Sequence, residues 1–325
     1  MSALEQFWYG NNSTGLRSWA LATALALGFT QTLTAFGLVD ASMSFYLTPS
    51  FVWLGAIIGG FCFGVGMALV GTCGFGALLR LGGGSLKSLV AVVIIGLTAL
   101  STQRGLLGNL RVGFFDNFTL DLSFAGNQSI PSILKAFTGL DLQYPLAAVF
   151  VFGALWWIFS DKNYRKQHSL IITSVIFAVV VTFGWAITAN MARISFDPVQ
   201  IESASFVMPL GDIILQFAAF TGSGPDYGVG LVFGTIIGAA LAARASNDVR
   251  WEACDDAREL SRHIFGAMLM GFGGVLALGC TIGQGISAAS LMAVSVPVTM
   301  FSIVFGARLG LAWLVEGSVK HAFRR

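Results

Sequence analysis

The sequence is dominated by apolar runs close to the length that crosses a lipid bilayer. A bilayer's hydrocarbon core is about 30 Å thick, and a helix needs about 20 apolar residues to cross it. A backbone in lipid must satisfy its own hydrogen bonds, so such runs indicate helices. Eight runs meet or approach this length: Trp19–Val39, Phe51–Val70, Leu86–Leu100, Pro145–Phe159, Leu170–Thr188, Tyr227–Ala243, Ile264–Leu278 and Leu291–Leu314.

The scarcity of charge supports the same interpretation. Of the 325 residues, 55% are hydrophobic and 10% are charged, whereas soluble domains carry about 25% charged residues. So few charges could not cover the surface of a large soluble enzyme, and that class is excluded. The net charge of +2 gives no indication of nucleic-acid binding. We therefore predict an all-α polytopic membrane protein with about 8 or 9 transmembrane helices and no removable signal peptide.

The cysteines and histidines do not suggest a cofactor. The four cysteines, Cys62, Cys73, Cys254 and Cys280, form no C-x-x-C pair, and the chain has only three histidines. A structural zinc site needs clustered ligands. We therefore predict no metal site, haem, iron–sulfur cluster or other cofactor.

A ninth apolar run, Phe206–Phe220, differs from the others. It contains Pro209, Gly211 and Asp212, and the helix-breaking sequence TGSGP follows it. We expect a re-entrant piece that enters the membrane without crossing it. Asp212 is predicted to cap a half-helix or, alternatively, to bind a proton during transport.

Lysines and arginines indicate which loops face the cytoplasm. They cluster in the loop 161–168, in the loop 244–263 and in the C-terminal tail. Counting crossings between these loops predicts a cytoplasmic N-terminus, a cytoplasmic C-terminus and an external polar loop 103–143.

The glycines around two cysteines suggest an internal repeat. Cys73 and Cys280 are separated by 280 − 73 = 207 positions, and four glycine pairs share this offset: Gly59 and Gly266, Gly64 and Gly271, Gly66 and Gly273, Gly76 and Gly283. The predicted topology sends the helices before the two cysteines in opposite directions. We therefore expect one transport domain with an inverted repeat, as transporters often have: repeat 1 over about 15–120, connecting helices over 121–200 and repeat 2 over about 201–325.

The two helix breaks, GTCGFG and GCTIGQG, occupy equivalent places in these halves. Glycine allows backbone N–H groups to turn toward a ligand without a Cβ in the way. The N-terminus of a following half-helix offers positive potential to an anion. Ser85 is predicted to cap the helix that begins at Leu86, and the three glycines before it could form an anion-binding nest.

The segments GTCGFGALLRLGGGSLKSL and ALGCTIGQGISAASLMA resemble the two signature segments of the YeeE/YedE family of sulfur-transport membrane proteins. The resemblance covers about two thirds of the chain. It implies an hourglass of about nine spanning helices whose inward-folded loops meet at the centre. It also implies uptake of thiosulfate, or of another small sulfur-containing anion, across the bacterial inner membrane. A soluble cytoplasmic sulfur-carrier protein is a possible partner by the same analogy.

Family members place cysteine thiols along the central path, and Cys73 and Cys280 match those positions. The family's thiosulfate transporters carry a further path cysteine near the N-terminus, but the first apolar run here contains none, and Cys62 cannot be equated with it. Transport of a sulfur oxyanion is therefore better supported than transport of thiosulfate itself.

The predicted mechanism uses the weak S–H donors of Cys73 and Cys280 at successive steps, because conduction needs binding loose enough to release. Alternatively, each cysteine is only a small packing residue. Arg80 and Lys87 either attract the anion at the inner mouth or merely hold a helix end in place. Gln284 either donates to the oxyanion or joins two helices. The predicted substrate-binding residues are Cys73, Gly74, Gly76, Arg80, Lys87, Cys280, Thr281, Gly283 and Gln284.

Two other function classes are alternatives. A membrane-embedded sulfur-transferring enzyme with a nucleophilic cysteine is the main alternative to a transporter. Such an enzyme needs a base or cation beside its thiolate, and no histidine lies near either cysteine motif in the sequence. An accessory subunit would leave the paired motifs without a purpose. A non-enzymatic permease is therefore the predicted function.

Overall fold

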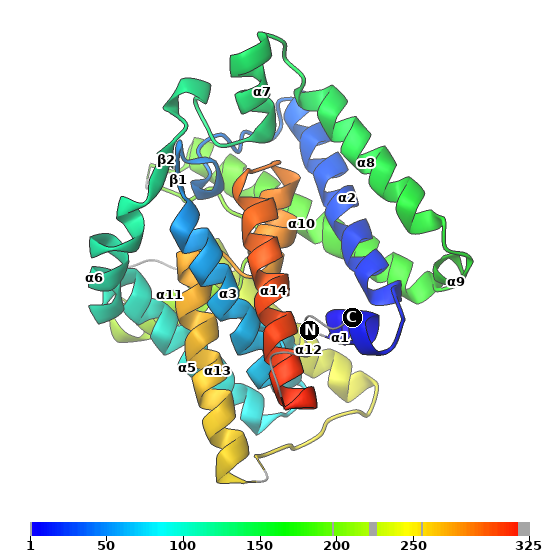
Figure 1. Cartoon of the computed structure of the whole chain (residues 1–325), viewed down its shortest axis with the longest axis vertical. Helices are drawn as coiled ribbons and strands as arrows, with labels where there is room; N and C mark the ends of the chain where they lie inside the picture. Colours follow the sequence, from blue (N-terminus) through cyan, green and yellow to red (C-terminus); the bar gives the residue numbers. More distant parts are fainter. Residues whose placement is uncertain (1, 197, 221–225, 255, 318–325) are drawn as a thin grey trace.

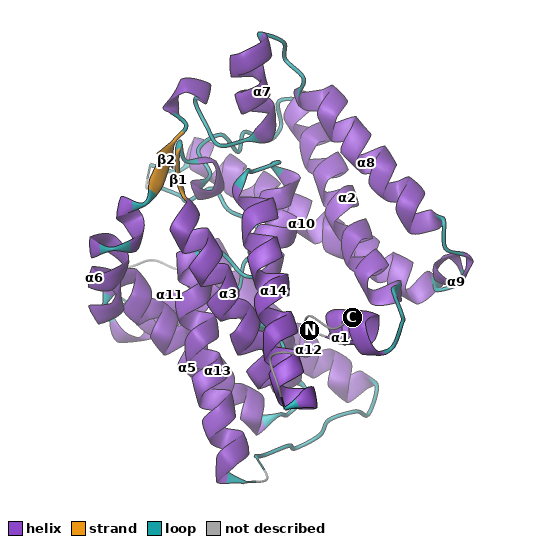
Figure 2. Cartoon of the chain, viewed as in Figure 1, coloured by secondary structure: helices purple, strands orange, loops and turns teal. Residues whose placement is uncertain are grey.

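A computed structural model describes residues 2–196, 198–220, 226–254 and 256–317. Over these residues the chain is almost entirely helical, with one short sheet (Figures 1 and 2). The α-helices are α1 (Ser2–Tyr9), α2 (Thr14–Ala35), α3 (Trp53–Val70), α4 (Gly74–Gly82), α5 (Leu86–Arg104), α6 (Leu106–Gly113), α7 (Ile130–Thr138), α8 (Gln143–Phe159), α9 (Lys162–Arg165), α10 (His168–Ile194), α11 (Val207–Ala218), α12 (Tyr227–Ala245), α13 (Ala257–Leu276) and α14 (Ser295–Glu316).

The remaining elements are short. They are the 3₁₀ helices η1 (Phe45–Leu47), η2 (Phe115–Asn117) and η3 (Ser123–Ala125), the π-helical segment η4 (Gly283–Ala288), and the strands β1 (Ser50–Val52) and β2 (Thr119–Asp121). The strands pair antiparallel, with Phe51 opposite Leu120. The sequence analysis did not predict this sheet.

Helices form at all the predicted apolar runs. Among the described residues, five helical stretches are long and apolar enough to cross a membrane: Trp53–Gly82, which joins α3 and α4, and α5, α10, α12 and α14. Large apolar side chains point away from the protein, for example Phe152 on α8, Phe183 on α10 and Phe301 on α14. The protein is therefore an all-α polytopic membrane protein, as predicted.

Helix α11 occupies the ninth apolar run. Its 12 residues cover about 18 Å at 1.5 Å per residue, too little to cross the hydrocarbon core. This length agrees with a re-entrant piece. Asp212, however, does not cap a helix, because it lies in the middle of α11 and its Oδ1 is 3.4 Å from an Arg104 nitrogen of α5. The capping prediction was wrong because the sequence showed no partner for this carboxylate. The breaker TGSGP lies outside the described residues.

Helices α3 and α13 cross antiparallel in the middle of the molecule through closely approaching glycines. Gly59 faces Gly273, and Gly66 faces Gly266. A Cβ on Gly59 would lie 2.7 Å from the carbonyl oxygen of Gly273. Small residues permit such approach where lipid supplies no hydrophobic drive between helices. Gly59 and Gly266 are 207 positions apart, and so are Gly66 and Gly273. The predicted repeat therefore relates the contact between Gly59 and Gly273 to the contact between Gly66 and Gly266.

A second pair of contacts follows the same pattern. Gly64 of α3 packs against Ile303 and Ala307 of α14, whereas Gly271 of α13 packs against Ile95 and Ala99 of α5. These partners are related by 303 − 95 = 208 and 307 − 99 = 208. The partners of the two glycines on α14 and α5 therefore share one offset, which is one residue larger than the offset of 207 between the glycines.

The backbone at the two breaks is also alike. Gly71 (φ 76°) and Leu278 (φ 53°) are left-handed and 278 − 71 = 207 positions apart. Gly84 (φ 104°) and Met292 (φ 56°) are left-handed and 292 − 84 = 208 positions apart. Left-handed backbone is uncommon for residues other than glycine, so its recurrence at Leu278 and Met292 supports two halves built to one plan.

The polar segments separate toward two ends of the molecule. Helix α7 and the β1–β2 pair lie at one end, and residues 246–254, which follow α12, lie at the other (Figure 1). Helix α9 follows the end of α8 that is remote from α7. Ser85 caps α5 as predicted, since its side chain accepts a hydrogen bond from the backbone N–H of Ser88. The basic residues of the C-terminal tail, Lys320, Arg324 and Arg325, lie outside the described residues.

Candidate functional site

Each cysteine of the two motifs stands at the start of a short helix and receives the same backbone hydrogen bond. Cys73 is the N-cap of α4, and its Sγ accepts from the N–H of Gly76 at 3.5 Å. Cys280 precedes the helical stretch that contains η4, and its Sγ accepts from the N–H of Gly283 at 3.5 Å. The N–H groups of Phe206 and Ile282 also face the Cys280 sulfur. The two thiols therefore occupy equivalent positions at two half-helices.

The glycines of the motifs permit this geometry. A Cβ on Gly76 would collide with the hydroxyl of Thr72, and a Cβ on Gly283 would lie 2.8 Å from the Tyr46 hydroxyl. At Gly74, a Cβ would meet Val207 of α11 at an ordinary 3.8 Å. Close neighbours therefore leave no room for a Cβ at positions 76 and 283, so glycine is required there. Position 74 has room for a Cβ.

One cavity of about 530 Å³ connects the two breaks. Cys73 and Phe75 line it from the first break, and Thr281 and Ile282 line it from the second. Leu4 of α1 and residues of α2, α10 and α14 complete the wall. Cys280 is 1% exposed and does not line the cavity itself, but the next residue, Thr281, does. The structure therefore brings the two motifs together.

The predicted cations are not beside the thiols. None of the described residues that line the cavity is charged. Arg80 is exposed in the last turn of α4, seven residues after Cys73, or about 10 Å along a helix. Within the described part of the chain, no acid forms an ion pair with Arg80. Lys87 lies in the first turn of α5, with its Nζ 3.7 Å from carboxylate oxygens of both Glu252 and Glu259.

The ion pairs of Lys87 allow a direct prediction. Because Glu252 and Glu259 already match its charge, K87Q is expected to change substrate uptake less than about twofold. Partly exposed ion pairs contribute about 0–1 kcal/mol, so the variant should also remain folded. Uptake and thermal unfolding in detergent measure the two effects. A large loss of uptake with normal unfolding would show that Lys87 binds substrate, as the sequence predicted.

Gln284 is engaged by the protein itself. It is fully buried, and its Nε2 donates to the carbonyl oxygen of Ala277 at 2.8 Å. Its Oε1 accepts from the Ser295 hydroxyl at 3.2 Å. These bonds tie the end of α13 to the start of α14 across the break. The arrangement fits the helix-joining alternative, and substrate binding by Gln284 stays a prediction.

The comparison with known proteins decides the family. Residues 1–309 match the family described as sulphur transport. The chain belongs to this family. Its helical fold and its family together make it a membrane transporter for a sulfur-containing anion, and they confirm the resemblance carried by the two cysteine motifs.

Two relatives of this sulphur-transport protein are named for their substrate. The chain is 26% identical over 294 residues to the thiosulfate transporter TsuA of Escherichia coli (strain K12), covering 84% of this chain and 77% of that protein. It is 27% identical over 276 residues to the thiosulfate transporter TsuA of Spirochaeta thermophila (strain ATCC 700085 / DSM 6578 / Z-1203), covering 81% and 78%.

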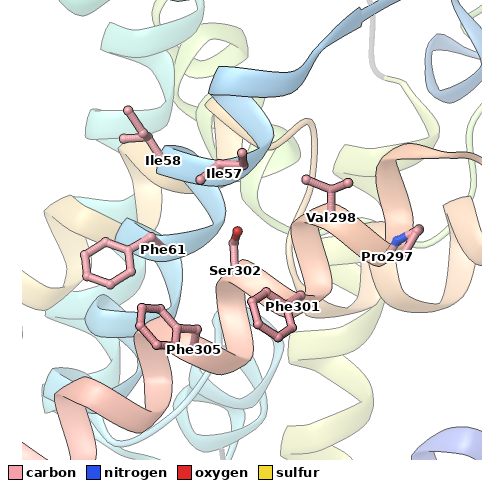
Figure 3. Close-up of a pocket in the computed structure, with 8 residues that line it drawn as sticks. All are labelled: Ile57, Ile58, Phe61, Pro297, Val298, Phe301, Ser302 and Phe305. Atoms are coloured by element: carbon pink, nitrogen blue, oxygen red, sulfur yellow. The ribbon is translucent and has the colours of Figure 1, made fainter.

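A groove with apolar walls lies elsewhere in the transporter. It measures about 740 Å³ and lies between α3 and α14, where Ile57, Ile58 and Phe61 face Pro297, Val298, Phe301 and Phe305 (Figure 3). Ser302 is the one polar residue among those drawn in the groove. An anion would gain little from such apolar walls, so this groove is not the candidate site.

Sequence analysis missed two polar residues beside Cys280. Tyr46 of η1 and Ser205, just before α11, both approach Gly283. Tyr46 falls in a segment without periodicity, and Ser205 falls before the ninth apolar run. No local pattern marks either one, because both are defined by contacts with residues 78 or more positions away.

Proposed function

We propose that this protein is a permease that carries thiosulfate, or a closely related sulfur oxyanion, along a path past its two broken helices. The observation that supports this most directly is the matched pair of thiols, each capping a half-helix beside one shared cavity. The names of the two relatives support thiosulfate as the substrate.

The local geometry suits a transient anion site. Each sulfur already accepts a backbone N–H, so its S–H proton is left to donate to a substrate oxygen or sulfur. A thiol is a weak, neutral donor, and it holds an anion less tightly than a cation would. Passage requires binding that is favourable enough to enter and weak enough to leave. The half-helix N-termini add positive potential at the same places.

The transport domain consists, in this proposal, of two inverted repeats over about 15–120 and 201–325, joined by 121–200. The reciprocal glycine contacts of α3 and α13 and the recurring left-handed residues support it. In such folds the substrate site lies where the broken helices of the two repeats meet.

The orientation in the membrane is also proposed rather than observed. Lysines and arginines in α9 and in the loop 244–263 favour a cytoplasmic position for the end that carries them. The protein would then lie in the bacterial inner membrane with a cytoplasmic C-terminus. A soluble sulfur-carrier protein could receive the substrate there.

Arg80 provides a test of electrostatic attraction at that end. In this orientation its unpaired guanidinium would face the inner mouth and attract a divalent anion. R80Q is expected to lower the transport rate about twofold to fivefold at low ionic strength, and the difference should shrink at high salt because screening weakens exposed charges. Flux measurements in proteoliposomes at two salt concentrations would check this. An equal deficit at both concentrations would point to a structural role instead.

The alternative function is sulfur transfer by a nucleophilic cysteine. Such chemistry would leave a persulfide on Cys73 or Cys280 after exposure to substrate, which mass spectrometry of the purified protein would detect. Intact labelled thiosulfate accumulating inside vesicles would instead support transport.

The deciding experiment uses a sulfur-starved bacterial strain that lacks its own thiosulfate uptake. Expression of this chain should restore growth on thiosulfate and produce uptake of ³⁵S-thiosulfate. A panel of other sulfur sources would define selectivity. If no sulfur source supports growth although the protein is in the membrane, the proposed substrate class is wrong.

A further inference from the structure

Two buried hydroxyl groups beside Cys280 face each other and form no hydrogen bond with any other described group. They belong to Tyr46 and Ser205, each 1% exposed. Both converge on one backbone position, since a Cβ on Gly283 would lie 2.8 Å from the Tyr46 oxygen and 3.0 Å from the Ser205 oxygen. The same Gly283 donates its N–H to the Cys280 sulfur. Three polar side chains therefore surround the start of the second half-helix.

Ser205 stands out within its own segment. Residues 202–206 are buried without forming a helix, and irregular backbone at membrane depth is tolerated only inside the protein or along a cavity. The neighbouring polar groups are satisfied: Ser203 donates to the carbonyl oxygen of Val181 at 2.6 Å, and Ala204 accepts from Ser287 at 2.7 Å. Only the Ser205 hydroxyl is left unbonded among the described side chains of this segment.

The ring of Tyr46 is held firmly by its packing. It packs edge-on against Trp185 at 6.3 Å between centroids. The indole of Trp185 is itself bonded to Ser290 at 3.0 Å, so it does not use the tyrosine oxygen. The Tyr46 hydroxyl faces Ser205 and lies beside Gly283, whose N–H donates to the Cys280 sulfur. Rigid packing thus holds a hydroxyl donor beside the half-helix that Cys280 begins.

Buried hydroxyls without partners are costly, and in native proteins they call for an explanation. An anion that reaches Cys280 would supply acceptor atoms to both hydroxyls and to the thiol at once. We propose that Tyr46 and Ser205 form, with Cys280, an oxyanion-binding subsite deeper than the cavity that Cys73 lines. This inference rests on the proposed function and adds two substrate-contacting residues that the cysteine motifs do not include.

The neutral donors of the subsite favour release. A hydroxyl or thiol donor holds an anion less tightly than a cation would. Passage requires binding that is weak enough for the substrate to leave.

The test measures the concentration dependence of ³⁵S-thiosulfate uptake in Y46F and S205A. Hydrogen bonds to charged groups contribute enough for each variant to raise KM about tenfold, and the double variant should raise it further. S205C, which keeps a weak donor, should lie between S205A and the wild type.

Matched controls remove equivalent groups elsewhere. Tyr164 of α9 is also fully buried with an unpartnered hydroxyl, but it lies in a separate cluster with Leu21 and Ile158. Y164F should therefore leave KM unchanged, and S203A controls for loss of a buried serine hydroxyl in the same segment. The amount of each variant in the membrane is measured in parallel.

The outcomes separate this inference from the proposed function. If the wild type takes up thiosulfate and Y46F and S205A match its KM, the subsite does not exist, although the permease does. If Y164F and S203A raise KM as much as the subsite variants, the effect is structural and the inference is wrong. If the wild type takes up no sulfur anion at all, the proposed permease function is wrong, and the subsite that rests on it is wrong as well.

Discussion

Replacing Cys280 with alanine is expected to reduce thiosulfate uptake at least about tenfold, and replacing Cys73 should have a similar effect. Each change removes the S–H donor at one half-helix while leaving the donating N–H groups of Gly76 and Gly283 in place. A hydrogen bond to a charged group contributes about 1.5–3 kcal/mol, and 1.4 kcal/mol corresponds to a factor of ten. Uptake of ³⁵S-thiosulfate by whole cells, normalised to protein in the membrane, measures the effect.

The other two cysteines provide controls for these variants. Cys254 lies in the loop between α12 and α13, and Cys62 lies on α3, so C254A and C62A should transport normally. Serine at position 73 or 280 keeps a donor of similar size and should retain more uptake than alanine. Unchanged uptake in both C73A and C280A would exclude a relay of thiols and would leave these cysteines as packing residues.

A methyl group at Gly64 is expected to disrupt the whole transport domain. The added Cβ would overlap the carbonyl oxygen of Ile303 and lie 2.7 Å from the backbone nitrogen of Ala307. Backbone atoms cannot move aside as side chains do, so α3 and α14 would have to separate. Overpacking typically costs 1–3 kcal/mol, and we expect G64A to lose about 3 kcal/mol or more. The measurement is thermal unfolding of the detergent-purified protein.

Helix α12 offers a matched control. A Cβ on Gly238 would meet no atom within 4 Å, so G238A makes the same chemical change in open space. Alanine also favours helix over glycine, so G238A should be as stable as the wild type or slightly more stable. Equal stability of G64A and G238A would contradict the tight crossing of α3 and α14.

The sequence by itself determined the class of this protein, its family and the places where its helices break. The apolar runs required helices because lipid offers the backbone no hydrogen bonds, and helices formed at each of them. Four of the glycines whose offset suggested a repeat meet where α3 crosses α13, as Gly59 with Gly273 and Gly66 with Gly266, but the sequence did not predict these contacts. The cap at Ser85 was likewise predictable, because capping depends on residues only three positions apart.

Tertiary structure alone decided which polar groups remain available to a substrate. Lys87 forms ion pairs with Glu252 and Glu259. The side-chain amide of Gln284 forms hydrogen bonds with residues on both sides of a helix break. Tyr46 and Ser205, which no motif marked, come together at Gly283 from segments far apart in the chain. Local periodicity indicates which face of a helix is buried, but it does not indicate which polar groups meet across a helix break or between separate segments. The free donors of this transporter could therefore be recognised only once the chain was folded.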